Sequence, residues 1–386
     1  MARMTTPELR PVARLLVDAV VPEEAGPPPA VPGTLRDVVV AARDHRVLPA
    51  VARHLAARDD CPPDWRPLLR LARDDQVVRH LGALGELAHL GAALDDAGVP
   101  WAVAKGPVAA GALWPALDMR EYYDLDLYVE RSRFEESVVV LRAAGCTAVD
   151  RNWPLVASER RAELALRAPR GSHVDLHWDI AVPRELRTAF RTDLPGMLRR
   201  RRRVDLGGGH RVWTFDAEDT LLLLAFHAAQ AGAGRLVWLA DVRRAAEADG
   251  LDWDVVVARA RAARVDVPLA LVLDRADRVL GLPAGAEPAC APAHGLLGRV
   301  ARRRDDREPP PGLPGDAHRG GGIYAAARPG TASTLAALLR GRHATRRTER
   351  AVRRGVPGAD EKALLLDVPD ERAERAYFAF VRSSEP

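Results

Sequence analysis

Two aspartates spaced two residues apart, Asp124 and Asp126, are the first residues whose types and spacing can do chemistry. They lie in the segment DLDLYV, where charged and apolar residues alternate with the period of two typical of a β-strand. On a strand both carboxylates point to one face, with Cα atoms roughly 7 Å apart, while Leu125 and Leu127 point into the core. Two such anions repel each other unless a cation lies between them, and Mg²⁺ prefers oxygen ligands. The pattern therefore indicates either a metal site or the solvated polar face of an edge strand.

A third aspartate, Asp175, lies in a second alternating segment, HVDLHWDI. Its apolar residues face one side of the predicted strand, and its polar residues, including His177 and Asp179, face the other. If this strand lies beside the first, Asp175 completes a three-carboxylate cluster. Such a cluster can hold two metal ions that clamp the attacking and leaving oxygens of a phosphoryl transfer. We expect His177 to support this cluster or contact the substrate, unless it is a structural histidine held by hydrogen bonds.

Lys105 and Gly106 end a short apolar segment, WAVAKG, which predicts a buried strand that leads into a turn and a helix. A glycine there lets backbone N–H groups approach a phosphate, and a helix N-terminus favours anions. Lys105 can add a point charge for a triphosphate; the alternative is a tight turn with a surface lysine. Arg120, four residues before Asp124, can contact phosphate, pair with the carboxylates, or form an exposed salt bridge.

These residues need a small mixed sheet to position them. Residues 100–215 predict such a core: a strand at 101, a helix, the strand 124–129, a helix, the paired strands 162–168 and 173–180, and a hairpin around 207–209. Residues 1–99 predict a helical region, with a capping box at Thr34 and Asp37. One face of its last helix is formed by Leu81, Leu84, Leu87, Leu90 and Leu94.

The second half of the chain predicts three further regions. Residues 216–285 fit a helical bundle, in which we interpret Trp238 as a core residue and Asp241 as a cap or a buried ion pair, although both, like His227, are also site candidates. Residues 286–358 are rich in Pro, Gly and Arg and predict a linker or disordered segment with one helix at 331–340. Residues 359–386 are apolar enough to dock back as a strand and a helix.

Composition excludes several classes of protein. The net charge is +4 and the pI about 9.2, too weakly basic to indicate nucleic-acid binding. The run Arg199–Arg203 suits a phosphate-rich partner or a solvated basic face, and arginine is abundant throughout, whereas only positions 105 and 362 are lysine. Three scattered cysteines form no disulfide framework. Without a signal-peptide pattern or an apolar stretch of about 20 residues, we expect a cytoplasmic protein that does not enter a membrane.

The motifs taken together resemble a known family. They are VPWAVAKGPVAAGALWP, MREYYDLDLYV, VDLHWDI, LLLLAFHAAQ and RLVWLADVRRAAEADGLDWDVV, in this order over roughly residues 30–285. This set is similar to the bacterial "uncharacterised nucleotidyltransferase" family of the DNA polymerase beta-like nucleotidyltransferase superfamily. The resemblance implies an α+β fold, with a small mixed β-sheet nucleotidyltransferase core flanked by N-terminal and C-terminal helical regions.

The same resemblance implies a site. Asp124 and Asp126 match the metal-binding acid pair of the superfamily, and Asp175 matches its third acid. Lys105 and Gly106 stand where the superfamily usually has a Gly-Gly or Gly-Ser turn that contacts phosphate, which is a departure from its pattern. The interval from Gly106 to Asp124 is also longer than in many members.

We therefore expect an enzyme that uses Mg²⁺ or Mn²⁺ to move an NMP group from an NTP to an acceptor. The acceptor is a small molecule, a peptide or a protein. Asp124, Asp126 and Asp175 are the expected catalytic and metal-binding residues, and Lys105, Gly106, Arg120 and His177 the expected nucleotide-binding residues. Two alternatives remain: a non-catalytic module that keeps the fold for binding, and an RNA-modifying transferase that uses Arg199–Arg203.

Overall fold

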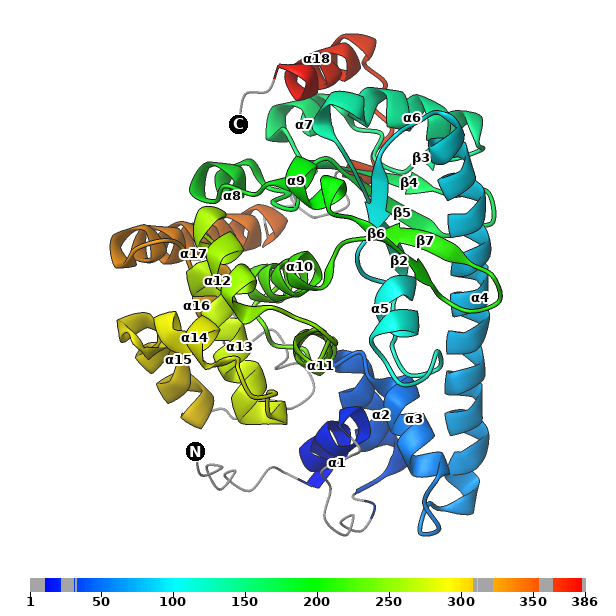
Figure 1. Cartoon of the computed structure of the whole chain (residues 1–386), viewed down its shortest axis with the longest axis vertical. Helices are drawn as coiled ribbons and strands as arrows, with labels where there is room; N and C mark the ends of the chain where they lie inside the picture. The colour runs from blue at the N-terminus through cyan, green and yellow to red at the C-terminus, as the bar shows by residue number, and fades with distance from the viewer. Residues whose placement is uncertain are drawn as a thin grey trace.

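The computed structural model describes residues 11–21, 31, 33–307, 311, 322–353 and 364–383. It is an α+β protein in which a mixed sheet lies beside a helical bundle (Figure 1). The N-terminal helices lie at one end of the molecule and the C-terminal helix at the other. One long helix follows an edge of the molecule over most of its length. The predicted fold class is confirmed.

The N-terminal region consists of α1 (Pro11–Val20), α2 (Leu35–Asp44), α3 (Leu48–Ala56), the short 3-10 helix η2 (Pro63–Trp65) and α4 (Arg66–Asp96). The capping box predicted at Thr34 and Asp37 is present at the start of α2. Of the leucines predicted to share a buried face of α4, Leu84, Leu87, Leu90 and Leu94 are buried, but Leu81 is 57% exposed. An α-helix turns about 300° in three residues, so repeated three-residue steps drift around its axis and carry Leu81 off the face.

The sheet has the strand order β1-β2-β5-β4-β3. Its strands are β1 (Trp101–Val103), β2 (Asp124–Val129), β3 (Thr147–Ala148), β4 (Glu163–Arg167) and β5 (His173–His177). β2 and β5 are parallel neighbours, whereas the pairs β1–β2, β5–β4 and β4–β3 are antiparallel. The sheet is therefore mixed, and the two predicted acid-bearing strands lie side by side at its centre.

Helices and loops cover this sheet. α5 (Pro107–Ala112), the 3-10 helix η3 (Arg131–Arg133), α6 (Phe134–Ala143) and α7 (Trp153–Glu159) connect the strands, and α4 packs against α6. The apolar residues of β2 and β5, such as Leu125 and Leu176, are buried in one core with the leucines of α4. After β5 come α8 (Arg184–Ala189) and α9 (Leu194–Arg199). The predicted hairpin follows as β6 (Arg202–Asp205) and β7 (Arg211–Thr214).

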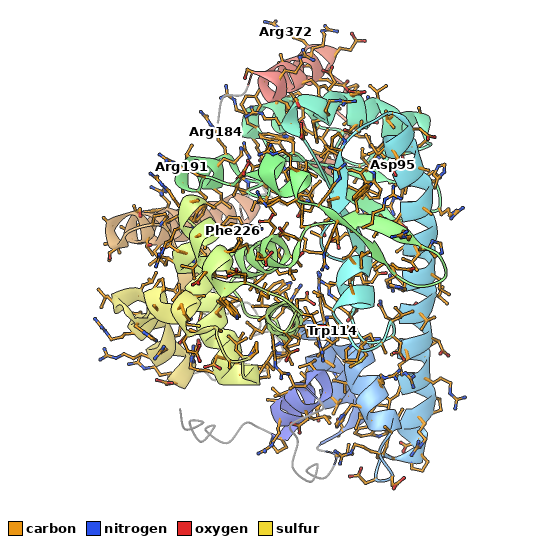
Figure 2. All side chains as sticks on the ribbon, viewed as in Figure 1. Asp95, Trp114, Arg184, Arg191, Phe226 and Arg372 are labelled. Atoms are coloured by element: carbon orange, nitrogen blue, oxygen red, sulfur yellow. The ribbon has the colours of Figure 1, made fainter. Side chains whose placement is uncertain are left out.

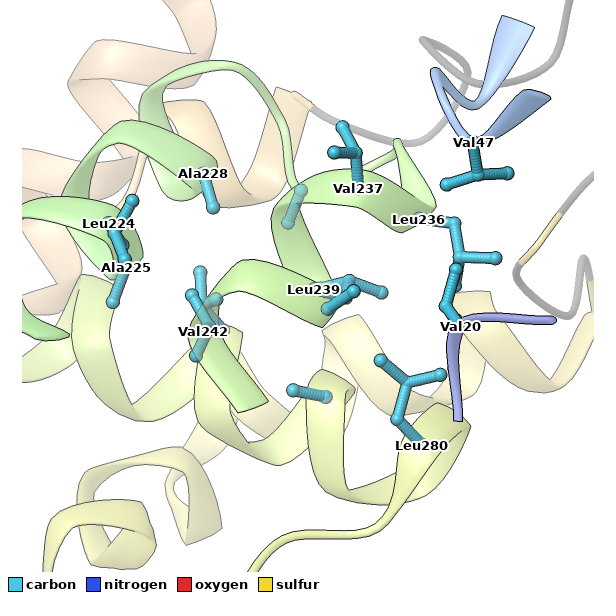
Figure 3. Close-up of a cluster of buried hydrophobic side chains, with 14 of the residues drawn as sticks. Val20, Val47, Leu224, Ala225, Ala228, Leu236, Val237, Leu239, Val242 and Leu280 are labelled. Atoms are coloured by element: carbon cyan, nitrogen blue, oxygen red, sulfur yellow. The ribbon is translucent and has the colours of Figure 1, made fainter. Parts of the chain in front are cut away.

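The helical bundle begins with α10 (Ala217–Gln230), α11 (Leu236–Ala246), α12 (Trp253–Ala262) and α13 (Asp266–Leu280), as the sequence predicts. Its core includes small residues such as Ala225 and Ala228, which let α10 and α11 approach closely. Figure 3 shows that Val20 of α1 lies beside Leu236 of α11 in this cluster. The N-terminal helices and the bundle therefore share one hydrophobic core.

The segment expected to be a linker is mostly helical where the structure describes it, and the one helix expected at 331–340 is present within a longer helix. Its elements are α14 (Glu287–Cys290), the 3-10 helix η4 (Ala291–His294), α15 (Leu296–Arg307), α16 (Gly322–Ala325) and α17 (Thr331–Arg353); residues 308–310, 312–321 and 354–358 lie outside the described residues. Buried Asp305 of α15 pairs with Arg275 and Arg278 of α13, each at 2.6 Å, and accepts a bond from Tyr324. Composition cannot show such partners, because they come from distant parts of the chain.

The C-terminal segment docks back on the sheet domain, as predicted. α18 (Glu371–Arg382) buries Tyr377, Phe378 and Val381 in the same core as the sheet. Arg131 donates hydrogen bonds to the carbonyl groups of Phe380 and Val381 at its C-terminal end. The expected strand is reduced to a single bridge at Val368. No described helix has both the length and the apolarity required to cross a lipid bilayer.

Candidate active site

A pocket of about 200 Å³ lies between the sheet and α10. Four acids contribute to its wall: Asp124 and Asp126 from β2, Glu163 from β4 and Asp175 from β5. Across from them, α10 contributes Leu223, Phe226, His227 and Gln230. Phe226 is labelled in Figure 2, near the middle of the molecule.

The register of the two central strands explains how the aspartates reach one pocket. In the parallel pair β2–β5, Asp126 lies opposite Asp175, and Tyr128 lies opposite His177. Neighbouring strands are about 4.8 Å apart, so side chains at paired positions on one face are adjacent. Asp124 precedes Asp126 by two residues and shares that face. The structure thus brings all three predicted acids to the same pocket.

Lys105 lies inside this pocket rather than at its rim. Its Nζ atom is 2.7 Å from Oδ1 of Asp126 and 3.4 Å from Nδ1 of His227, and only 12% of the side chain is exposed. Burial opposes the charge of the ammonium group, but Asp126, with Asp124 and Asp175, outweighs it and raises the pKa of Lys105. Lys105 is therefore a buried cation among carboxylates.

Asp126 is the most strongly held of the acids. Besides Lys105, it has His177 as a partner, with Nε2 3.2 Å from the same Oδ1 atom. Burial opposes its charge, yet these two partners hold the pKa of Asp126 well below its usual range. Burial likewise opposes the charge of His177, but its hydrogen bond to Asp126 raises the pKa of the imidazole. The ring of His177 also stacks on Tyr128 at 4.7 Å between centroids, so this histidine fixes the orientation of Asp126.

The negative charges of Asp124 and Asp175 are less well neutralised by positive partners than the charge of Asp126. Burial, together with repulsion from Glu163 and Asp126, raises the pKa of Asp175 to about 7. Burial and repulsion from Asp126 also raise the pKa of Asp124. The pocket therefore carries more negative charge than Lys105 alone balances, and an additional cation would be stabilised there.

The donor set suits a hard divalent ion, because it consists of carboxylate oxygens. Within the described ranges, however, no three His, Cys, Asp or Glu side chains already converge as a ready metal cage. Lys105 and His177 both engage Oδ1 of Asp126, so a metal ion held by this carboxylate would compete with Lys105. The chemistry of the residues fits Mg²⁺ or Mn²⁺, provided that Lys105 gives way.

Gly106 makes the turn from β1 to α5 with a φ angle of 54°, a conformation that glycine adopts without strain. A Cβ atom at this position would lie 2.9 Å from the carbonyl oxygen of Asp124. The glycine thus lets the turn pass directly against the acid-bearing strand. This geometry places the backbone of Gly106 next to the pocket, although whether it binds phosphate stays a prediction.

Arg120 does not line the pocket. Its guanidinium forms a two-pronged bond with Asp241 of α11, at 2.8 and 2.7 Å, and also donates to the Gly106 carbonyl at 3.4 Å. Trp114, labelled in Figure 2, donates to the same carboxylate at 2.7 Å. The ion-pair interpretation of Asp241 is confirmed, and Arg120 supports the Gly106 turn from behind.

Two residues of the pocket carry chemistry that the sequence alone did not single out, Glu163 and Gln230. Glu163 begins an alternating segment, ELALR, but only the β4–β5 register shows that it faces His177. His227 was a candidate, and it faces Lys105 in the pocket. Burial and the nearby Lys105 charge lower the pKa of His227 to about 3, so its ring is neutral. Trp238 packs edge-on against this ring at 5.9 Å.

The run Arg199–Arg203 is used within the protein. Arg200 pairs with Asp219 at 2.8 Å and Arg203 with Asp95 at 3.2 Å. Arg201 lies over the ring of Trp213 at 4.6 Å. These contacts engage three of the five arginines, while Arg199 and Arg202 are exposed.

A fold with paired acids on adjacent central strands, next to a glycine turn, defines the nucleotidyltransferase class. The family model for "Uncharacterised nucleotidyltransferase" matches residues 34–281. The chain therefore belongs to this family, and the match spans α2 to α13, including every residue of the pocket. No curated protein matches the chain significantly.

Proposed function

We propose that the chain is a metal-dependent nucleotidyltransferase that moves an NMP group from an NTP to a hydroxyl acceptor and releases pyrophosphate. One observation carries this proposal: Asp124, Asp126 and Asp175 line one pocket, with Asp126 directly opposite Asp175 in the β2–β5 pair. The family match supports nucleotidyl transfer in general. The metal, the nucleotide and the acceptor are parts of our proposal.

The three aspartates would hold Mg²⁺ or Mn²⁺. When bound, such ions neutralise phosphate charge and align the attacking and leaving oxygens. His177 keeps the Asp126 carboxylate oriented through its Nε2 atom. Asp175 lies opposite Asp126 in the same pocket and would help to take the proton of the acceptor hydroxyl.

Lys105 and the Gly106 turn would bind the phosphates of the NTP. Lys105 supplies a positive charge just after β1, and the Gly106 turn at the start of α5 lies directly against the acid-bearing strand. Arg120 holds the turn in place through the Gly106 carbonyl. These three residues act by positioning and by charge, which is most of what phosphoryl transfer requires of a protein.

The acceptor or the nucleoside would lie against the far wall of the pocket. This wall is apolar, with Ile180, Val182, Leu186 and Phe226. Gln230, one turn of α10 after His227, has an Nε2 atom that is buried without a hydrogen-bond partner. An amide donor at the edge of an apolar wall suits a ligand with a flat or apolar body and a polar edge.

The direct experiment is to incubate the protein with each NTP and Mg²⁺ or Mn²⁺, and to measure pyrophosphate release and labelling of the protein or of added acceptors. Labelling that requires the metal and is lost in Asp126→Asn supports the proposal. NTP binding without pyrophosphate release in any condition would favour the alternative of a non-catalytic binding module. An RNA-modifying transferase would require salt-sensitive RNA binding by Arg199–Arg203. The ion pairs of Arg200 with Asp219 and of Arg203 with Asp95 argue against this alternative.

A further inference from the structure

We infer that Lys105 is the counter-ion of the acid pocket. Its ammonium group pairs with Asp126 in the metal-free protein and moves to His227 when a divalent metal ion binds. This inference rests on the proposed metal site. It gives Lys105 two alternating partners instead of a single role as a phosphate contact, and it identifies a residue that sets the metal affinity of the site.

The first support is the position of the ammonium group. Its Nζ atom lies 2.7 Å from Asp126 Oδ1, which is the distance of a strong charge-assisted hydrogen bond. Asp126 lies between Asp124 on its own strand and Asp175 on the next. The ammonium group therefore lies at the acid that is central to the proposed metal site, and a metal ion has to compete with it there.

The second support is the charge balance of the pocket. Asp124, Glu163 and Asp175 surround the Asp126–Lys105 pair, while His227 on the opposite wall is neutral. Carboxylates that are buried so close to one another are unstable without a cation. In the absence of a metal ion, Lys105 supplies that charge, and His177 also bonds to Asp126. When a divalent ion supplies it instead, the ammonium group and the ion repel each other, so Lys105 has to leave Asp126.

The third support is a second acceptor already within reach. Nδ1 of His227 is 3.4 Å from the lysine Nζ atom, and a neutral imidazole presents a lone pair to such a donor. The edge-on contact with Trp238 holds the ring in place. Since the lysine stem is flexible, Lys105 can change partners through side-chain rotation, without movement of a strand or helix. In the displaced position it remains in the pocket and can meet the phosphates of the NTP.

The decisive variant is Lys105→Met, which removes the competing charge but keeps most of the side-chain volume. Titration of Mn²⁺ into the protein without NTP, followed by electron paramagnetic resonance of the free ion, measures metal affinity directly. We expect Lys105→Met to bind Mn²⁺ at least about tenfold more tightly than wild type, because metal ligands must be free of other cations. Lys105→Arg keeps the charge, so it should bind no more tightly than wild type.

An unchanged or weaker Mn²⁺ affinity in a folded Lys105→Met protein overturns the inference. So does a complete absence of Mn²⁺ binding in both proteins. Asp126→Asn serves as the reference for loss of the site and should bind Mn²⁺ more weakly than wild type.

A second measurement uses the wild-type chain, in case the variants do not fold. The sequence has only two lysines, at positions 105 and 362, so lysine labelled with ¹³C at Cε gives two signals, and Lys362→Arg assigns them. Added Mg²⁺ should shift the Lys105 signal and leave the other unchanged. A Lys105 signal that does not respond at saturating Mg²⁺ contradicts the exchange of partners. Neither measurement contains NTP, so nucleotidyl transfer can fail while the exchange is observed, or the reverse.

Discussion

Arg120 and Asp241 form a buried, two-pronged ion pair between residues 121 positions apart in the chain. The guanidinium of Arg120 comes from the loop before β2, and the carboxylate of Asp241 from α11 of the bundle. Because Arg120 also donates to the Gly106 carbonyl, this pair connects the helical bundle to the turn beside the acid pocket. Arg120 is therefore a positioning residue for the site.

Asp241→Asn should destabilise the protein by about 3–5 kcal/mol, because it leaves the guanidinium of Arg120 buried without its counter-ion. Denaturant unfolding monitored by tryptophan fluorescence measures this change. The matched control is Glu371→Gln, which removes the exposed pair with Arg375 on α18 and should cost less than about 1 kcal/mol. Equal effects of the two substitutions would show that the Arg120–Asp241 pair contributes no more to the free energy of unfolding than an exposed ion pair does.

Asp126→Asn should abolish nucleotidyl transfer while the protein stays folded. A metal ion contributes several kcal/mol to the transition state, so we expect pyrophosphate release to fall by at least about 100-fold. Circular dichroism checks the fold. The matched control is Asp179→Asn, two residues after β5, since Asp179 accepts hydrogen bonds from Thr192 and from the Ala181 amide outside the pocket. If Asp126→Asn is as active as wild type, the site assignment is wrong.

Gly106→Ala should impair both stability and transfer without removing any functional group. Gly106 and Gly98 both have positive φ angles, 54° and 64°. Only at Gly106 would the new Cβ atom meet backbone, the Asp124 carbonyl at 2.9 Å; at Gly98 nothing lies within 4 Å. Gly98→Ala should therefore show only the cost of the backbone conformation, about 1 kcal/mol.

The difference between these two glycine variants reports the contact with Asp124 together with the backbone conformation of Gly106, whose φ of 54° and ψ of −122° lie outside the left-handed region that other residues can adopt. We expect Gly106→Ala to unfold at a lower denaturant concentration than Gly98→Ala and to lose transfer activity, because relief of the contact with Asp124 must move either the turn or β2. Full activity of Gly106→Ala would mean that the turn and the acid-bearing strand tolerate a change in their spacing, and would remove Gly106 from the site.

The sequence predicts the local parts of this site because its signals are local. The alternation in DLDLYV and HVDLHWDI places Asp124, Asp126 and Asp175 on strand faces, and no knowledge of other strands is needed. The β2–β5 register and the entry of Glu163 into the pocket depend on which strands pair. The bond from Lys105 to Asp126 depends in addition on a side-chain conformation. Period-two patterns carry none of this long-range information.

The helices after residue 286 show the same limit. A composition rich in Pro, Gly and Arg indicates a linker, yet α15 packs because Asp305 finds Arg275 and Arg278 on α13. Arg120 is a similar case. Its position four residues before Asp124 allows a phosphate contact, a pair with the carboxylates or an exposed salt bridge, whereas its partner, Asp241, lies in another region of the fold. In both cases a charged residue is committed to a distant counter-ion.

The free energy of unfolding of Asp175→Asn, relative to that of wild type, should increase as the pH rises, when both proteins are measured in EDTA to remove metal ions. The pKa of Asp175 is about 7 in the folded protein, against 3.8 in an unfolded chain. The folded state therefore binds this proton more tightly, and the stabilising contribution of the protonated form is lost as the pH rises from about 4 to about 7. Asparagine is uncharged at every pH, so the variant does not lose this stability as the pH rises.

The free energy of unfolding, measured by denaturant at several pH values, checks this sign. The difference between Asp175→Asn and wild type should grow in favour of the variant by at least about 1 kcal/mol between pH 4.5 and 7.5, since each pKa unit corresponds to about 1.4 kcal/mol. Glu136→Gln is the control. Its partner Arg133 does not titrate in this window and holds the pKa of the Glu136 carboxyl below its usual range, so the difference between this variant and wild type should change little between pH 4.5 and 7.5. A flat difference for Asp175→Asn as well would mean that its carboxyl group titrates normally, and the acid pocket would then need no further cation.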